Sequence, residues 1–176
     1  MMKVTLIRHT APDVPKGTCY GHTDVALKET FEQEAAITAQ NLKGMNFDKV
    51  YSSPLSRCVK LATYCGYPDA EQNDQLKEMN FGDWEMMPLK ELKNPTVEEF
   101  YKNYLSYQIP HGESFQMIYA RVSNFLDQLK QKQYKNVAIF SHGGVLRCAE
   151  IYAGHLKMEH AIEYLTPFGG IIQIDI

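Results

Sequence analysis

Histidine and arginine stand together where apolar runs of the sequence end. Arg8 and His9 directly follow the first apolar run, and His142 directly follows another, with Arg147 close behind it. A neutral imidazole is a good nucleophile that can accept a phosphoryl group and release it to water. The planar guanidinium of arginine donates two parallel hydrogen bonds to phosphate oxygens, which lysine does not. These residue types predict phosphoryl-transfer chemistry.

Arginine is scarce in this chain, so its positions carry information. Only four of the 18 Lys and Arg residues are Arg, and lysine is the usual cation. Arg8, Arg57 and Arg147 each follow a predicted strand, and ligands bind at the carboxyl ends of strands in open α/β sheets. For Arg147 two interpretations stay open, a contact with phosphate or an ion pair with a carboxylate behind the site, and we favour the second. Arg121 lies inside a predicted helix, where a structural or surface role is expected.

A phosphate ester also requires an acid, because its alcohol must leave with a proton. Three carboxylic acids lie close together in the sequence, at Glu78, Asp83 and Glu85. Glu78 is our candidate, although spacing alone does not choose among the three. The two glycines that follow His142 offer backbone N–H groups at a predicted helix start, which suits an anion. We therefore expect Gly143 to contact the substrate.

Short apolar runs that alternate with helical stretches must position these side chains. The apolar runs predict strands at residues 3–7, 49–51, 137–140, 162–165 and 171–174, with a tight turn at 169–170. Helices are predicted at residues 30–43, from 54 onward, at 113–130 and from 143 to about 153. A capping box of Thr30 and Gln33 is expected to start the first helix, and Ser53 is expected to cap the second.

Strands that alternate with helices predict a three-layer α/β sandwich. The 176 residues correspond to one domain of ordinary size, so a single domain is expected over residues 1–176. Residues 66–110 have the least regular pattern. They are predicted to form an insertion over one end of the sheet that caps the active site.

The composition excludes several classes of protein. Hydrophobic residues make up 44% and charged residues 22%, as is typical of a globular domain. The net charge of −3 provides no basic field for nucleic acid, and no apolar run is long enough to span a membrane. The start of the sequence lacks the pattern of a signal peptide. The four scattered cysteines lack zinc-ligand spacing and are typical of a reducing compartment, so a cytoplasmic location is expected.

Four segments of the chain resemble, in the right order, the motifs of the histidine phosphatase superfamily, the phosphoglycerate mutase-like proteins. They lie at residues 6–10, 52–57, 76–85 and 141–147. The resemblance implies a phosphoglycerate mutase-like α/β/α sandwich with a mostly parallel central sheet. It also implies a phosphatase acting on a small-molecule phosphomonoester. No metal or other cofactor is expected, because arginine and histidine side chains can stabilise the charge of the transferring group.

The same resemblance assigns a role to each candidate. His9 is expected to become phosphorylated. Arg8, Arg57 and His142 are expected to surround the phosphoryl oxygens. Glu78 matches the acid of the family, which protonates the leaving group and later helps water to attack.

Within the superfamily, two segments resemble the α-ribazole-5′-phosphate phosphatases of cobalamin nucleotide-loop assembly. They are residues 8–10 with 17–25, and residues 111–114. We accordingly expect Thr10, Tyr20 and Gly21 to contact the substrate. The sequence departs from the superfamily at Thr10 and at Met86, because glycine usually occupies both positions. The departure at Met86 is expected to affect the geometry of its loop and the fit of the substrate.

Three other functions stay open. A broad small-molecule phosphatase lacks a cobalamin role but shares the chemistry. A phosphoglycerate mutase shares the motifs, although such mutases are generally longer, with insertions that shield the phosphohistidine. A binding module without activity would have lost His9, an arginine or the acid, and all are present here. The oligomeric state is not predicted.

Overall fold

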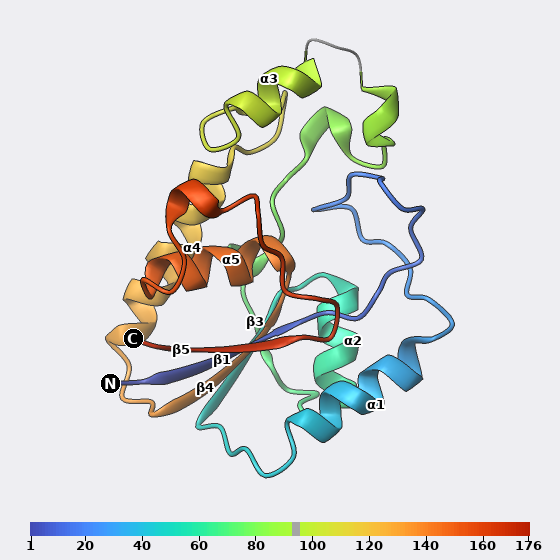
Figure 1. The fold of residues 1–176 in the computed structure, drawn as a ribbon. Helices are drawn as coiled ribbons and strands as arrows, with labels where there is room; N and C mark the ends of the chain where they lie inside the picture. Colours follow the sequence, from blue (N-terminus) through green and yellow to red (C-terminus); the bar gives the residue numbers. More distant parts are fainter. Residues whose placement is uncertain (93–95) are drawn as a thin grey trace.

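A five-stranded sheet lies at the centre of the computed structural model, which describes residues 1–92 and 96–176 (Figure 1). Its order is β3-β2-β4-β1-β5. The strands are β1 Lys3–Arg8, β2 Lys49–Ser52, β3 Glu71–Gln72, β4 Asn136–Ser141 and β5 Ile171–Asp175. The pairs among β1 to β4 are parallel, and β5 is antiparallel to β1. The prediction of a mostly parallel central sheet is confirmed.

The register of the parallel strands brings their carboxyl ends to one edge of the sheet. Arg8 at the end of β1 lies opposite Ser141 at the end of β4. His9 and His142, which follow these two strands, therefore emerge next to each other. β2 runs in the same direction on the other side of β4, so Ser53 emerges beside them.

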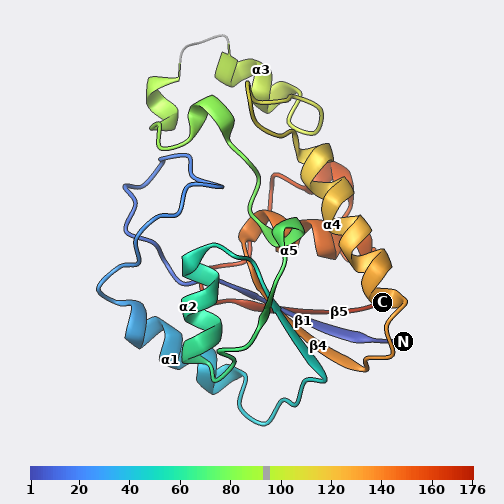
Figure 2. The ribbon, with the colours of Figure 1, turned by 180° about the vertical axis from the view of Figure 1, so that it is seen from behind.

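Helices cover both faces of the sheet and complete three layers (Figures 1 and 2). α1 and α2 pack on one face around Ile7 and Phe140, whereas α4 and α5 pack on the other around Leu6 and Ile139. Side chains alternate along a strand, so β1 and β4 need apolar residues for both cores. Most of their buried residues are apolar, and the exceptions are Thr5 and the terminal residues Arg8 and Ser141. The helices are α1 Phe31–Asn41, α2 Ser56–Tyr64, α3 Thr96–Lys102, α4 Phe115–Lys130 and α5 Gly143–Tyr152. None of the helices in the described part of the chain is long and apolar enough to cross a membrane.

α1 begins directly after Thr30 as predicted but without the predicted capping box, and the predicted start of α2 is wrong. Thr30 has φ −78° and ψ 2°, which is not the extended conformation of a capping residue, and its hydroxyl donates to Glu34 (2.7 Å) instead of forming a capping box. α2 begins at Ser56, two residues later than expected, because Leu55 is still extended, with φ −67° and ψ 136°.

The predicted strand at residues 162–165 does not form. These residues follow the 3₁₀ helix η4 Met158–His160 as turns and irregular chain. Ile162 and Leu165 are 41% and 46% exposed and line the cavity described below. Their apolar character therefore belongs to a cavity wall, while β5 occupies the edge of the sheet beside β1.

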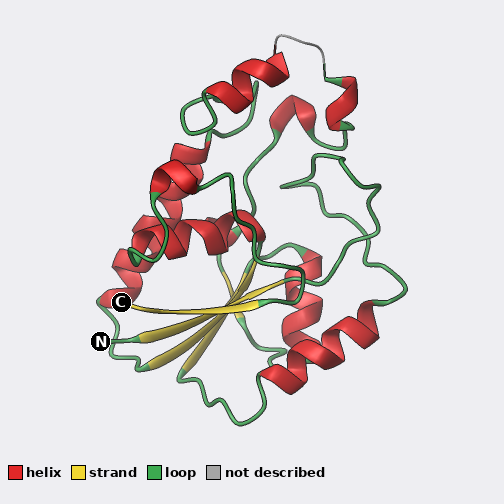
Figure 3. Ribbon diagram, viewed as in Figure 1, coloured by secondary structure: helices red, strands yellow, loops and turns green. Residues whose placement is uncertain are grey.

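The described residues of the segment 66–110 form short elements joined by loops, which explains their irregular sequence pattern (Figure 3). α3 lies at the end of the molecule farthest from the sheet (Figures 1 and 2). The ring of Trp84 packs against those of Phe100 and Tyr107, with centroids 5.2 and 5.8 Å away. Besides β3 and α3, the segment contains the 3₁₀ helices η1 Asp74–Leu76, η2 Gly82–Trp84 and η3 Leu89–Glu91.

Candidate active site

The two histidines that follow β1 and β4 lie side by side at the carboxyl edge of the sheet. The ring centroids of His9 and His142 are 5.2 Å apart, and the rings meet edge to face. The backbone N–H of His9 donates to the carbonyl oxygen of Ser141 (3.0 Å). Only 2% of His9 and none of His142 is exposed. The register of β1 and β4 thus places both rings next to each other in a buried site.

A single hydrogen bond decides which nitrogen of His9 can react. Nδ1 lies 2.7 Å from the carbonyl oxygen of Thr10. Because a carbonyl oxygen only accepts, Nδ1 carries the proton and Nε2 keeps a free lone pair. Burial, together with the charges of Arg57 and Arg8, lowers the pKa of His9 well below its usual value and outweighs the opposing effect of this hydrogen bond. The ring is therefore neutral at neutral pH, the form that acts as a nucleophile.

His142 is held by polar groups from the residue after β2 and from α2. Its Nε2 lies 2.8 Å from the hydroxyl of Ser53 and 3.5 Å from the thiol of Cys58. Burial lowers the pKa of His142 well below its usual value, and the charges of Arg57 and other nearby groups lower it further. Two neutral imidazoles therefore face each other beside buried arginines.

Arg8 reaches the site from the last position of β1. Its Nη1 donates to the carbonyl oxygen of Thr166, and its guanidinium lies 3.9 Å from the centre of the Phe168 ring. Burial lowers the pKa of Arg8, although the neighbouring Glu78 carboxylate acts in the opposite direction. The loop before β5 thus fixes the position of this charge.

Arg57 projects from the first turn of α2 and is completely buried. Nη1 donates to the carbonyl oxygen of Thr23 (3.1 Å), and Nη2 donates to that of Gly21 (2.7 Å). The side chain therefore anchors the loop at residues 21–23 in addition to placing a charge beside the histidines.

Several buried polar atoms around His9 have no hydrogen-bond partner. Among the described residues they include Nε of Arg8, Nε of Arg57 and the hydroxyl of Thr10. Buried polar groups are normally paired, and these three belong to residues that surround His9. The arrangement suits a bound anion with several oxygens.

Glu78 approaches the site from the segment after η1. Its Oε2 accepts a hydrogen bond from the N–H of Gly144 (3.1 Å), and its Oε1 accepts one from the N–H of Met79 (2.9 Å). The N–H of Gly144, which we expected to serve a bound anion, thus holds this carboxylate instead. A Cβ at 144 would lie 2.1 Å from Oε1 of Glu78, so a larger residue at this position would displace the carboxylate.

The other two candidate acids, Asp83 and Glu85, form hydrogen bonds with other groups. Asp83 pairs with His111 (2.9 Å), and both side chains are exposed. Glu85 accepts hydrogen bonds from the loop at residues 21–23 and from the N–H of Phe81. Of the three acids, Glu78 is the one that lines a cavity together with Arg8.

This cavity has a volume of about 290 Å³, and its wall is mostly apolar and aromatic. Arg8, Glu78 and Arg147 are its charged residues. The rest of the wall includes Tyr20, Met79, Phe81, Phe100, Tyr101, Tyr104, Phe115, Ile118 and Leu165. A phosphate bound at Arg8 would leave its organic group in this space.

The expected substrate contacts fall into two kinds. Tyr20 lines the cavity, and the hydroxyl of Thr10 is one of the unpaired buried atoms. Gly21 instead packs against the chain near Glu78, since a Cβ there would lie 1.8 Å from the carbonyl oxygen of Met79. Gly143 passes close to Arg8, whose Cζ would lie 3.2 Å from a Cβ at this position.

The sequence interpretation was wrong for Arg147 and did not identify Phe168. Arg147 donates to the carbonyl oxygen of Tyr164 and the hydroxyl of Tyr104, both at 2.8 Å, so our interpretation of an ion pair with a carboxylate is wrong. Phe168, which packs on Arg8 and His9, was overlooked because a lone aromatic before a glycine turn gives no signal.

No group of His, Cys, Asp and Glu side chains within residues 1–92 and 96–176 is arranged to hold a metal ion.

Comparison with known proteins identifies close similarities over nearly the whole chain. A sequence model of the "Histidine phosphatase superfamily (branch 1)" matches residues 4–175. The adenosylcobalamin/alpha-ribazole phosphatase of Escherichia coli is 32% identical over 153 residues, which cover 82% of this chain and 75% of that protein. Phosphoserine phosphatase 1 of Hydrogenobacter thermophilus is 29% identical over 81% of this chain and 71% of its own length.

A solved structure shows the same fold. The crystal structure of the alpha-ribazole phosphatase from Shigella flexneri superimposes with a TM-score of 0.87 at 30% identity. The match covers 99% of this chain and 91% of that one.

Proposed function

This chain belongs to the histidine phosphatase superfamily (branch 1) and is a phosphatase of that family; we propose that it hydrolyses a small-molecule phosphomonoester through a phosphohistidine at His9. The observation that carries this proposal is the neutral His9 ring, whose Nε2 is free because Nδ1 is held by a carbonyl oxygen. The buried charges of Arg8 and Arg57 beside it favour an anionic ligand.

In the first step, Nε2 of His9 attacks phosphorus, and the bond from phosphorus to the ester oxygen breaks. Arg8, Arg57 and His142 stabilise the charge on the phosphoryl oxygens. Glu78 gives its proton to the departing oxygen, which leaves as an alcohol. In the second step, the Glu78 carboxylate takes a proton from water as the water oxygen attacks phosphorus. The bond between phosphorus and Nε2 of His9 breaks, and inorganic phosphate leaves.

The cavity next to Arg8 favours an alcohol that carries an aromatic or apolar group, because such surfaces gain most from its aromatic wall. α-Ribazole 5′-phosphate meets this requirement through its benzimidazole base, so we propose it as the substrate, with a role in cobalamin nucleotide-loop assembly. Thr10, Tyr20, Gly21 and Gly143 are the proposed contacts. Residues 66–110, which supply much of the wall, are the proposed cap.

Arg147 supports a second candidate substrate. Its guanidinium lies in the cavity wall and would pair with a carboxylate of the substrate. Phosphoserine carries such a carboxylate, and one relative is named a phosphoserine phosphatase. A broad phosphatase and a phosphoglycerate mutase remain alternatives that the same experiment separates.

The substrate is tested by comparing kcat/KM for α-ribazole 5′-phosphate, phosphoserine, 3-phosphoglycerate and p-nitrophenyl phosphate. We expect release of inorganic phosphate and the highest value for α-ribazole 5′-phosphate. The Arg147→Met variant should leave that value largely unchanged. A preference for phosphoserine that Arg147→Met abolishes would favour the second candidate, and transfer without phosphate release would indicate a mutase.

The nucleophile is tested with the His9→Ala variant. We expect no turnover and no acid-labile phosphoenzyme after rapid quenching with labelled substrate, while circular dichroism shows a retained fold. The wild-type protein should form the labelled intermediate. Hydrolysis at the wild-type rate by folded His9→Ala would exclude His9 as the nucleophile.

A further inference from the structure

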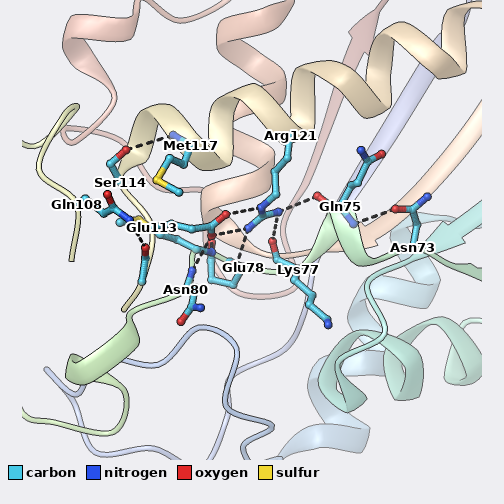
Figure 4. A network of polar contacts seen from close by, with 12 residues as sticks. Asn73, Gln75, Lys77, Glu78, Asn80, Gln108, Glu113, Ser114, Met117 and Arg121 are labelled. Carbon is cyan, nitrogen blue, oxygen red and sulfur yellow. Dashed lines mark hydrogen bonds and ion pairs between the residues drawn. The ribbon is translucent and has the colours of Figure 1, made fainter. Parts of the chain in front are cut away.

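The guanidinium of Arg121 reaches from α4 to the backbone that carries Glu78 (Figure 4). Nη1 donates to the carbonyl oxygens of Gln75 (2.8 Å) and Lys77 (2.7 Å), and Nη2 donates to that of Glu78 (2.8 Å). One side chain thus holds three carbonyl groups within four consecutive residues.

Glu113 completes the contacts of the same guanidinium. Its Oε1 accepts from Nε of Arg121 (2.8 Å) and its Oε2 from Nη2 (2.9 Å), while Oε2 also accepts from the N–H of Asn80 (2.8 Å). The two side chains are only 19% and 14% exposed. The ion pair therefore fixes the chain on both sides of Glu78.

The five contacts use all the donors that arginine has. Nε supplies one N–H, Nη1 supplies two for carbonyl oxygens, and Nη2 supplies one for Glu78 and one for Glu113. No N–H of Arg121 is left for a phosphate. Lysine has three donors on a single nitrogen and does not reproduce this pattern.

β4 contributes the remaining attachment of the segment. The hydroxyl of Ser141 donates to the carbonyl oxygen of Leu76 (2.7 Å). Every carbonyl oxygen of residues 75–78 is thus held by the side chain of Arg121 or Ser141. The carboxylate of Glu78 points away from this anchor to the N–H of Gly144 at the cavity wall.

We propose that Arg121 is a positioning residue for the acid, which holds the backbone of Glu78 so that its carboxyl group meets the departing oxygen. Arg121 acts through Glu78 and touches neither the phosphoryl group nor the leaving group. This inference rests on the proposed role of Glu78 as proton donor. A displacement of about 1 Å in such a group is sufficient to slow a reaction about 10²-fold.

The test compares leaving groups that differ in their need for a proton. Glycerol 1-phosphate loses a poor alkoxide, whereas p-nitrophenyl phosphate loses a stable phenolate. In single-turnover formation of phosphohistidine, Arg121→Met should slow the first substrate about 10²-fold and the second only a few-fold. Arg121→Lys should show the same selectivity to a smaller extent, and Glu78→Gln should show it at least as strongly.

Val122→Ala is the matched control, because Val122 neighbours Arg121 on α4 but is buried in the core between α4 and the sheet. It should destabilise the protein without changing the ratio of the two rates. If Arg121→Met does not fold, Arg121→Lys and Ser141→Ala carry the test. Equal slowing of both substrates in the folded Arg121 variants, with selective slowing in Glu78→Gln, would overturn the positioning role and leave Glu78 as the acid. Absence of selectivity in Glu78→Gln itself would remove both proposals.

Discussion

Arg57 combines two tasks in a single fully buried side chain. Both of its terminal nitrogens hold carbonyl oxygens of the loop at residues 21–23, and its Nε is left without a partner among the described residues. The contacts of the terminal nitrogens shape the cavity wall near Tyr20. The free Nε is proposed to bind the phosphoryl group. Both depend on the fork of the guanidinium rather than on its charge alone.

We therefore expect Arg57→Lys to be a severe change. The loss of kcat/KM should correspond to about 2–4 kcal/mol, as for the removal of an oxyanion donor. The melting temperature should also fall, because the loop loses its anchors. Steady-state kinetics and thermal unfolding measure the two effects separately. If the melting temperature falls while kcat/KM stays within a few-fold of wild type, Arg57 serves the fold alone.

The loops on either side of the site depend on a few local contacts. Glu85 gathers the N–H groups of residues 21–23, and the next residue, Met86, has a positive φ of 64°. A side chain in this left-handed region costs about 1–2 kcal/mol, so glycine fits this conformation better than Met86 does. The side chain of Met86 is 45% exposed, so little packing depends on it.

At this position Met86→Gly should stabilise the protein. Relief of the left-handed conformation should outweigh the added entropy of the unfolded chain and raise the free energy of unfolding by about 0.5–1 kcal/mol. Urea unfolding measures the change. Met87→Gly is the control. Because Met87 lacks a positive φ, the same substitution there should destabilise the protein. A loss of stability in both variants would contradict the expectation.

The burial of the site makes the stability of the whole molecule depend on pH. The pKa values of His9 and His142 lie well below the usual value, because burial and the neighbouring arginines disfavour the charged rings. Below about pH 6.5 the unfolded chain binds protons that the folded chain does not. The contribution of these two histidines to stability is therefore fully present above this pH. It is lost as the pH falls towards their lowered pKa values.

For each of the two histidines, the free energy of unfolding should fall as the pH drops below about 6.5, with a limiting slope of about 1.4 kcal/mol per pH unit. His9→Gln removes one of these groups, so its unfolding free energy should fall less steeply by that amount. Urea unfolding at several pH values gives both slopes. His155→Gln, which replaces an exposed histidine, is the control for the substitution itself. Identical slopes for wild type and His9→Gln would show that His9 is not held neutral by the fold.

Features that depend on local pattern and residue type could be predicted from the sequence alone. Apolar runs that end in Arg8–His9 and Ser141–His142 indicated buried strands with chemistry at their carboxyl ends. The order of four motifs indicated the family and its three-layer sandwich, which the sheet and the family match confirm. Residue types were informative here because a buried parallel strand requires a continuous apolar run, and few residue types suit a phosphoryl group.

Residue spacing left three nearby acids open, and the folded structure places Glu78, rather than Asp83 or Glu85, at the cavity. Glu78, Asp83 and Glu85 lie in a segment without periodicity, so their directions depend on contacts from distant elements, such as the clamp by Arg121. The segment at residues 162–165, which is apolar except for Glu163, likewise looks the same in sequence whether it enters a sheet or lines a cavity. Burial, hydrogen-bond partners and the tautomer of a histidine are properties of neighbours that are remote in the chain, and folding alone brings these neighbours together.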